Sequence, residues 1–197
     1  DVADDPQPQP GQVYDLLLVM LDAATKAVDW TAAAQNGQPV EYPIIGQVIS
    51  PAGDMRDLIQ TPLTPSTITF PGFARLAGYA TSTAPAPGQS LTLTLLWQVE
   101  QPTPDNWTQF IHLTGADANY VLADGLPRGE NYPTWAWSPG EQIVDEWTLD
   151  LPDDLPPGDY TLRLGFYRQD SGDRMPAEQD GAPAPASAPA LLIFRVD

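Results

Sequence analysis

The sequence predicts an all-β protein: an antiparallel β-sandwich of the immunoglobulin-like or jelly-roll type, with additional N-terminal strands from a truncated repeat. Three observations lead to this class. Apolar residues alternate with polar ones in several stretches, Pro-Gly, Asp-Gly and Asn-Gly pairs separate those stretches, and the 197 residues include 23 prolines. Alternation with a period of two is typical of strands, and proline-rich spacers favour short elements joined by rigid turns.

The N-terminal stretch allows two interpretations. Residues 16–35, "LLLVMLDAATKAVDWTAAAQ", have an alanine-rich composition that suits a short helix. The alternation before this stretch and Asn36-Gly37 after it favour two strands joined by a turn instead.

The remaining strands are expected from residue 67 onward. The clearest is 91–99, "LTLTLLWQV", in which every second residue is apolar. The stretch 141–151 also alternates, but it places Asp145 on the same face as Ile143 and Trp147. The other candidates are residues 67–80, 107–114, 119–123, 158–168 and 190–196.

Two stretches of the chain resemble each other. Residues 4–21, "DDPQPQPGQVYDLLLVML", and 153–167, "DDLPPGDYTLRLGFY", both run from an acidic pair through a proline-rich turn to a tyrosine-led strand. We therefore predict residues 1–58 as the last third of a repeat, 59–66 as a linker, and 67–197 as a β-sandwich domain. Because a few unpartnered strands are not stable in water, we expect strands within 13–50 to pair with another β-sandwich domain or chain.

Charge and composition exclude several classes of function. The net charge of −18 repels phosphate backbones and anionic lipid, so we expect no nucleic-acid partner. No apolar run approaches the roughly 20 residues of a membrane helix, so we expect no membrane insertion by this segment. The chain has no cysteine, which excludes disulfides and cysteine-based sites.

The most aromatic stretch is residues 131–141, "NYPTWAWSPGE". Tyr132, Trp135 and Trp137 fall in a predicted loop, where exposed rings would stack on sugars. The alternative is that Trp137 closes one end of the sandwich and Tyr132 hydrogen-bonds a loop. The three residues are therefore candidate ligand-binding residues for a glycan.

Carboxylates near predicted turns and strand ends suggest calcium as the one metal to consider. The candidate ligands are Asp117, Asp124, Glu141 and Asp145, although no D-x-D-x-D-G loop is present, and we expect no other cofactor. Glu141 could instead cap the Pro139-Gly140 turn, and Asp145 could pair with Arg75 or Arg128. A glycosidase pair among these residues is left open, because the sequence does not give the distance between carboxylates.

The single histidine, His112, lies in the predicted strand 107–114 beside Phe110 and Ile111. We expect it to be packed and hydrogen-bonded rather than to bind a metal, because no cysteine or second histidine is available. The sequence has no G-x-S-x-G motif that would place a nucleophilic serine beside it. We therefore do not expect an enzyme.

A family resemblance follows from the motifs of the C-terminal region. The stretches "FARLAGYA", "PGQSLTLTLLWQ", "TQFIHLTG", "YVLADGLPRG", "NYPTWAWSPGEQIVDEW" and "LPPGDYTLRLGFY" resemble extracytoplasmic β-sandwich domains of Chloroflexota-type bacteria. Such domains follow the membrane part of glycosyltransferase-like proteins or stand in tandem on surface proteins. The resemblance covers about residues 68–197 and, truncated, 4–50. Trp135 departs from the pattern, which has a small polar residue there.

The resemblance implies a location at the cell surface and no defined activity. We therefore expect a non-catalytic extracytoplasmic module with a structural or interaction role in a surface or membrane-anchored protein. The alternative is a carbohydrate-binding module that uses the aromatic loop 131–141, and a glycan-active enzyme comes third.

Overall fold

The computed structural model describes residues 9–17, 32–33, 39–40, 44–115 and 118–197. The chain divides into two units, Asp1–Ser50 and Pro51–Asp197. Among the described residues, no helix is long and apolar enough to cross a membrane.

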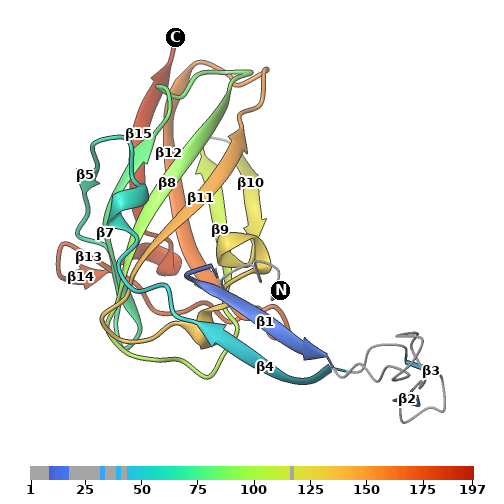
Figure 1. Ribbon diagram of the computed structural model, residues 1–197. Helices are drawn as coiled ribbons and strands as arrows, with labels where there is room; N and C mark the ends of the chain where they lie inside the picture. Colours follow the sequence, from blue (N-terminus) through green and yellow to red (C-terminus); the bar gives the residue numbers. More distant parts are fainter. Residues whose placement is uncertain (1–8, 18–31, 34–38, 41–43, 116–117) are drawn as a thin grey trace. The chain divides into compact units, whose positions relative to one another are not determined.

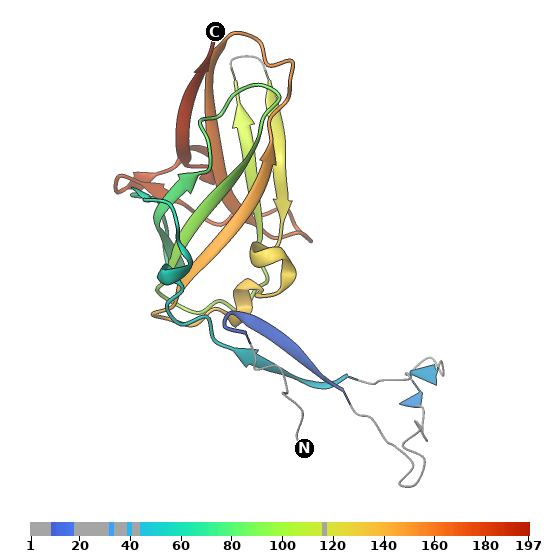
Figure 2. The same cartoon turned by 45° about the horizontal axis from the view of Figure 1, so that its top comes forward.

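The second unit is an antiparallel β-sandwich, as predicted (Figures 1 and 2). One sheet has four strands, in the order β10 (Asn119–Gly125), β9 (Thr108–Thr114), β12 (Gly158–Tyr167) and β15 (Ala190–Val196). The other has seven, in the order β11 (Gln142–Asp150), β8 (Ser90–Val99), β7 (Ala74–Thr81), β6 (Thr69–Phe70), β13 (Glu178–Gln179) and β14 (Ala182–Pro183), with β5 (Thr64–Pro65) paired to β7. Four 3₁₀ turns connect them: η1 (Arg56–Leu58), η2 (Pro127–Glu130), η3 (Thr134–Ala136) and η4 (Pro185–Ser187).

Strands occur in every stretch predicted from residue 67 onward, with one difference. The stretch 67–80 is not a single strand, because a turn at Pro71-Gly72 separates β6 from β7. Gly72 has a φ of +80°, a left-handed conformation that side-chain-bearing residues rarely adopt, and the Phe73 N–H closes the turn on the Phe70 carbonyl at 3.0 Å. The two short strands then pair with each other.

The core lies between the two sheets and centres on aromatic rings. Trp97 from β8 and Phe166 from β12 have ring centroids 5.2 Å apart, and Phe70 meets Phe166 edge-on at 4.9 Å. Phe73 stacks on Trp137 at 5.4 Å, and all five side chains are buried. Aromatic pairs in such geometries add about 0.5–1.5 kcal/mol each to the gain from burial, so this cluster joins the two sheets firmly.

The domain boundary differs from the predicted one. The division falls after Ser50 rather than at residue 58, and residues 59–66 are not a free linker, because Thr64 pairs with Tyr79 of β7. Ala52 and Met55 are buried within the second unit. The Met55 N–H donates to the Gln142 carbonyl at 2.9 Å, so the segment after Ser50 is part of the sandwich.

In the first unit, β1 (Gln12–Leu17) pairs antiparallel with β4 (Ile44–Ser50), and β2 (Ala32–Ala33) pairs with β3 (Pro39–Val40). The helix considered for residues 16–35 falls mostly outside the described residues, apart from Leu16 and Leu17 in β1 and Ala32 and Ala33 in β2.

The two stretches that resemble each other share a local feature. The Tyr14 hydroxyl accepts from the Gln9 N–H at 2.6 Å, and the Tyr160 hydroxyl donates to the Pro156 carbonyl at 2.8 Å. Each tyrosine thus binds the backbone just before its own strand, and each strand pairs with the last strand of its unit. The tandem repeat, and the pairing of 13–50 with another domain or chain, stay predictions.

The face of the four-stranded sheet that points away from the core depends on a close approach at Gly165. Phe110 on β9 lies directly opposite Gly165 on β12, and its ring occupies the space above the glycine. A Cβ at position 165 would lie 2.5 Å from Phe110 Cζ and 2.8 Å from the Ser187 carbonyl oxygen. We call this surface, which carries Phe110, His112 and Thr114, the outer face.

Gly165→Ala is expected to destabilise the protein by about 1–3 kcal/mol, because the methyl group would displace both the Phe110 ring and the η4 backbone. Urea unfolding measures this change. Thr161→Ala, on the same strand with a half-buried side chain, serves as the control and should stay within about 0.5 kcal/mol of the wild type. Equal stability of Gly165→Ala and wild type would contradict the packing described.

Candidate functional site

The aromatic loop does not form a sugar-binding platform. Tyr132 and Trp137 are 0% and 1% exposed, so the prediction that both bind a ligand is wrong. The Trp137 indole donates to the Tyr132 carbonyl at 2.9 Å and stacks on Phe73, which closes one end of the core. Trp135 is half-buried and lies within η3, so it is the only one of the three residues that keeps surface for a ligand.

Tyr132 and Glu141 form a buried network that secures the chain at the start of the sandwich. The Glu141 carboxylate accepts from the Tyr132 hydroxyl at 3.0 Å, from the Ala52 N–H at 2.8 Å and from the Ser138 N–H at 2.8 Å. Burial and the neighbouring carboxylate raise the pKa of Tyr132, which keeps its hydroxyl a donor. Glu141 therefore caps the turn before it, as the sequence suggested, and also holds residues 51–53.

Asp145 is a second buried carboxylate, and it stands apart from the first. It lies on β11 and accepts from the Arg128 N–H at 2.7 Å and from the Trp147 indole at 2.6 Å. Arg128 has a left-handed φ of 60°, and its guanidinium donates to the Val144 carbonyl at 3.0 Å. Of the two partners expected for Asp145, the structure thus has Arg128, mainly through its backbone. Burial raises the pKa of Asp145 to about 6, against the opposing effect of these donors.

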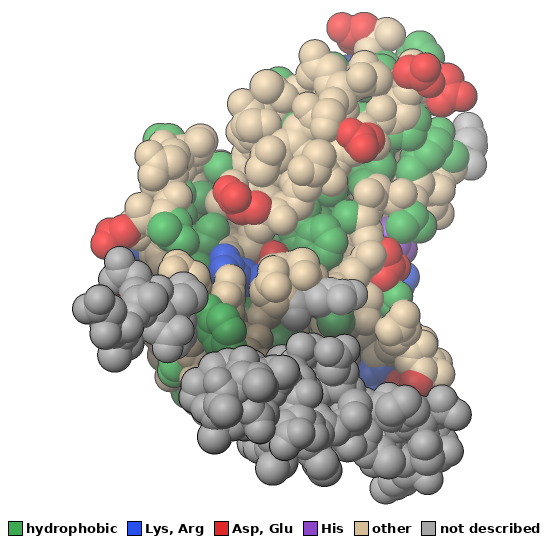
Figure 3. All heavy atoms as spheres, turned by 45° about the vertical axis from the view of Figure 1, so that its right-hand side comes forward, with side chains coloured by type: hydrophobic (Ala, Val, Ile, Leu, Met, Phe, Trp, Pro, Cys, Tyr) green, Lys and Arg blue, Asp and Glu red, His purple; other side chains and the backbone are tan. Residues whose placement is uncertain are grey.

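The predicted calcium ligands do not come together. The carboxylate oxygens of Glu141 and Asp145 already accept hydrogen bonds in two separate networks. Asp124 accepts from the Tyr167 hydroxyl at 2.7 Å on the outer face. Asp117 lies outside the described residues. Across the described part of the chain, no three acidic or histidine side chains are grouped as metal ligands would be. On the face of the molecule that Figure 3 shows, acidic side chains are distributed over the surface rather than gathered in one cluster.

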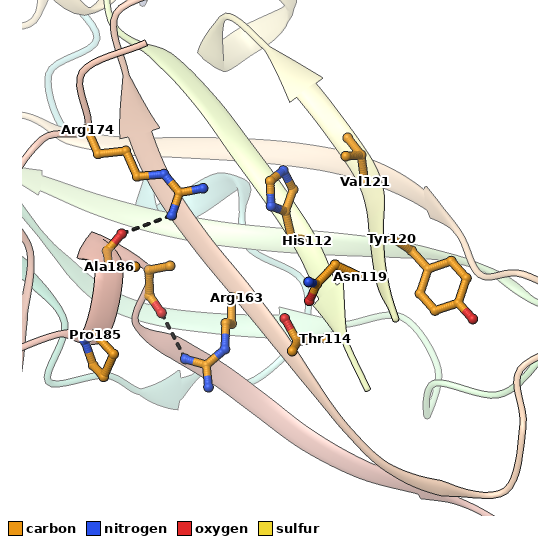
Figure 4. Close-up of a pocket in the computed structure, with 10 residues that line it drawn as sticks. His112, Thr114, Asn119, Tyr120, Val121, Arg163, Arg174, Pro185 and Ala186 are labelled. Carbon is orange, nitrogen blue, oxygen red and sulfur yellow. Dashed lines mark hydrogen bonds between the residues drawn. The ribbon is translucent and has the colours of Figure 1, made fainter. Parts of the chain in front are cut away.

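A groove of about 490 Å³ lies on the outer face, and we call it the outer groove. Its floor is formed by His112 and Thr114 on β9 and by Arg163 on β12, since His112 and Arg163 are opposite each other in the sheet. One wall is β10, with Asn119 and Val121, and the other is η4 (Figure 4).

Arg174 lies beyond η4, and its guanidinium extends over this face toward His112 (Figure 4). The guanidinium carbon lies 4.6 Å from the centroid of the Phe110 ring, and the Phe110 and His112 rings are 4.7 Å apart. A second hollow of about 280 Å³ shares His112 and Arg174 with the outer groove and adds Asp124 and Tyr167. The two hollows therefore lie side by side along β9.

The site of His112 differs from the expected one in one respect. The ring packs on Phe110 as predicted, but it is half-buried and makes no hydrogen bond with any described residue. Burial lowers the pKa of His112, and the positive charge of Arg174 lowers it further. The imidazole is therefore neutral near pH 7 and presents one donor and one acceptor to the groove.

Comparisons with known proteins assign this chain to no family. No protein-family model matches the chain, and no curated protein matches it. One similar solved structure is the C-terminal domain of wzt, with a TM-score of 0.44 and 20% identity over 68% of this chain and 82% of that one. A likeness at this level supports no assignment of function.

Glu141→Gln is expected to destabilise the protein by about 2–4 kcal/mol, because the amide places a donor among the N–H and O–H groups that now share a carboxylate. Equilibrium urea unfolding measures the change. Glu146→Gln, which alters an exposed carboxylate five residues along the chain, should have an effect below about 0.5 kcal/mol. If both variants behave alike, the buried network does not stabilise the sandwich.

Asp145 should make the free energy of unfolding depend on pH. Between the pKa of 3.8 for an unperturbed aspartate and about 6, the folded state keeps a proton that the unfolded state has released. The contribution of this group is thus fully present below pH 3.8 and is lost as the pH rises through about 6. The loss amounts to about 3 kcal/mol, since one pKa unit corresponds to about 1.4 kcal/mol.

Urea unfolding of wild type and Asp145→Asn at pH values from 4 to 7 isolates this group from the other carboxylates. The stability of the wild type relative to Asp145→Asn should fall by about 3 kcal/mol over that range. Asp150→Asn, at the exposed end of the same strand, should parallel the wild type. Parallel profiles of wild type and Asp145→Asn would show that Asp145 is not a buried, proton-retaining group.

Proposed function

We propose that this protein is a non-catalytic β-sandwich module that binds a glycan in the outer groove. The observation that carries the proposal is a groove of about 490 Å³ on the outer face of the four-stranded sheet, floored by hydrogen-bonding side chains. Its size matches the range of about 300–1,000 Å³ found for small-ligand sites.

The residue types of the groove suit a ligand rich in hydroxyl groups. The Asn119 amide and the neutral His112 imidazole each offer a donor and an acceptor, and the Thr114 hydroxyl can take either role. Each hydroxyl of a sugar is also both donor and acceptor. Val121, which is 65% exposed, and Ala186 add apolar surface for the C–H faces of the rings.

The same groove supports the non-catalytic part of the proposal. Glycoside hydrolysis uses two carboxyl groups on either side of the scissile bond. The described residues that line the outer groove include no carboxylate, and Glu141 and Asp145 are buried elsewhere in hydrogen-bond networks. A ligand in this groove would be bound without being cleaved.

A structural or interaction role at the cell surface is the second candidate. It is favoured by the first unit, where β1 and β4 form a sheet of two strands on which Val48 and Ile49 are 43% and 41% exposed. Two-stranded sheets are marginal in water, so a partner sheet would stabilise this one. The extracytoplasmic location belongs to this proposal as well, and it rests on the resemblance of the sequence to surface domains.

The glycan-binding proposal is tested by screening the full chain on a glycan array and measuring each hit by calorimetry. Asn119→Ala and His112→Ala are expected to weaken binding roughly tenfold each, the worth of one hydrogen bond with a buried partner. Thr148→Ala, an exposed change on the opposite sheet, should have no effect.

Trp135→Ala separates the outer groove from the aromatic loop. Binding should be unchanged in this variant, because Trp135 does not line the groove. The proposal fails if no glycan binds, or if binding is lost in Trp135→Ala and kept in Asn119→Ala.

A further inference from the structure

We infer that the outer groove selects glycans that carry an acidic group: a carboxylate, sulfate or phosphate on the sugar. The inference rests on the proposed function, since it specifies the ligand of the same groove. It comes from the positions of Arg163 and Arg174.

The arginines of this chain differ in whether they form ion pairs with carboxylates. The chain has 26 acidic residues and 8 basic ones, so a basic side chain has many possible partners. Four arginines do form ion pairs with carboxylates at N–O distances of 2.5–3.7 Å: Arg56, Arg75, Arg168 and Arg195. Among the described residues, three arginines form no ion pair with a carboxylate within 4.0 Å: Arg128, Arg163 and Arg174. The last two both line the outer groove, so this strongly acidic protein has two arginines without an ion-pair partner at one place.

Backbone carbonyl groups in and next to η4 hold the side chains of Arg163 and Arg174. Arg163 Nη1 donates to the Ala188 carbonyl and Arg174 Nη1 to the Ala186 carbonyl, each at 2.9 Å (Figure 4). Ala186 and Ser187 in η4 both have left-handed φ values, of 50° and 51°. Consecutive left-handed residues that are not glycine are strained, and such strain persists only where the surrounding structure fixes it. The turn therefore presents fixed carbonyl groups that orient both guanidinium groups.

The two guanidinium groups keep further N–H donors with which a ligand could bond. A guanidinium has five N–H donors, and each of these two uses one nitrogen for a protein carbonyl. Carboxylates, sulfates and phosphates accept two parallel N–H bonds from an arginine, whereas a neutral sugar hydroxyl accepts only single bonds. Donors already oriented at the groove bind such an anion without a large cost in side-chain entropy.

The charges along β9 agree with this assignment. Burial lowers the pKa of His112, the charge of Arg174 lowers it further, and Asp124 acts in the opposite direction. Asp124 lines the second hollow and not the outer groove, and its carboxylate is occupied by the Tyr167 hydroxyl. The acidic group of a ligand would thus lie between Arg163 and Arg174, on the η4 side.

The experiment compares matched acidic and neutral polymers on the full chain. Polygalacturonate is paired with galactan, and dextran sulfate with dextran, by affinity electrophoresis and calorimetry at 50 and 200 mM NaCl. Inorganic sulfate and phosphate are measured alone, to separate a bound anion from a bound glycan. The variants are Arg163→Gln and Arg174→Gln, with Arg195→Gln as the control, because Arg195 lies outside the groove and already pairs with Asp159 at 2.9 Å.

At least one acidic polymer is expected to bind tenfold or more tightly than its neutral partner, and less tightly at the higher salt concentration. Arg163→Gln and Arg174→Gln should each reduce that preference roughly tenfold, the worth of a charge-assisted hydrogen bond, and Arg195→Gln should leave it unchanged. Thermal unfolding checks that each variant is folded. If Arg163→Gln does not fold, Arg163→Lys is used in its place and should keep part of the preference for the acidic polymer.

Three results would overturn the inference. Equal affinity for the acidic and neutral polymers would remove it while leaving glycan binding in place. An equal effect of Arg195→Gln would show general charge attraction, and inorganic anions that bind as well as the polymers would show an anion site without sugar recognition. Binding of no polymer at all would instead remove the proposed function itself.

Discussion

The close approach of Phe110 to the backbone of Gly165 is the constraint on which the outer face depends. Because residue 165 has no side chain, the Phe110 ring lies on the sheet in the place where a side chain of β12 would stand. The Arg174 guanidinium lies over this ring, and the His112 imidazole packs against it. The η4 backbone comes down to the same point, with the Ser187 carbonyl next to Gly165. Because Gly165 has no side chain, Phe110 and η4 can both approach β12, and this close packing positions the floor and one wall of the groove.

The fold uses its acidic residues in two different ways. Most of the described ones lie at the surface, where they contribute to the net charge of −18. Glu141 and Asp145 are instead buried, each among backbone N–H groups and one aromatic donor. These hydrogen bonds fix the positions of the neighbouring loops, because both oxygens of each carboxylate are already bound.

The inner faces of the two sheets and the outer face of the four-stranded sheet carry different kinds of side chains. The inner faces pack aromatic rings, and the loop 131–141 adds Trp137 and Tyr132 to that packing. The outer face of the four-stranded sheet keeps polar residues, and the segment after β12 folds back over only part of it. An antiparallel sheet can face water on one side, so a binding groove there does not interrupt the core. This arrangement places the proposed binding groove apart from the core that stabilises the fold.

Local pattern was enough to predict the long strands of the sandwich, whereas the two-residue strands β5, β13 and β14 lie outside every predicted stretch. The alternation in 91–99 and 158–168 and the turn pairs between strands gave the elements of the sandwich, because burying one face of a sheet imposes a period of two on the sequence. The turn at Gly72 divided one predicted strand, since a single glycine does not reveal its φ. The sequence also suggested Glu141 as a turn cap and either Arg75 or Arg128 as the partner of Asp145, and the structure has Arg128.

Only the tertiary structure decided which residues could meet a ligand. Tyr132 and Trp137 appeared suitable for sugar binding because the sequence shows aromatic residues in a loop but not whether the core covers them. The outer groove could not be predicted, because His112, Arg163 and Arg174 are far apart in the chain and meet only through the register of β9 with β12 and the return of η4. The alternation of apolar residues in a strand is local, because it follows from burying one face of the sheet. The groove instead depends on which residues of distant strands the sheet register places side by side. The sequence by itself therefore determined the class of fold, and the packed sheets decided where the protein can bind.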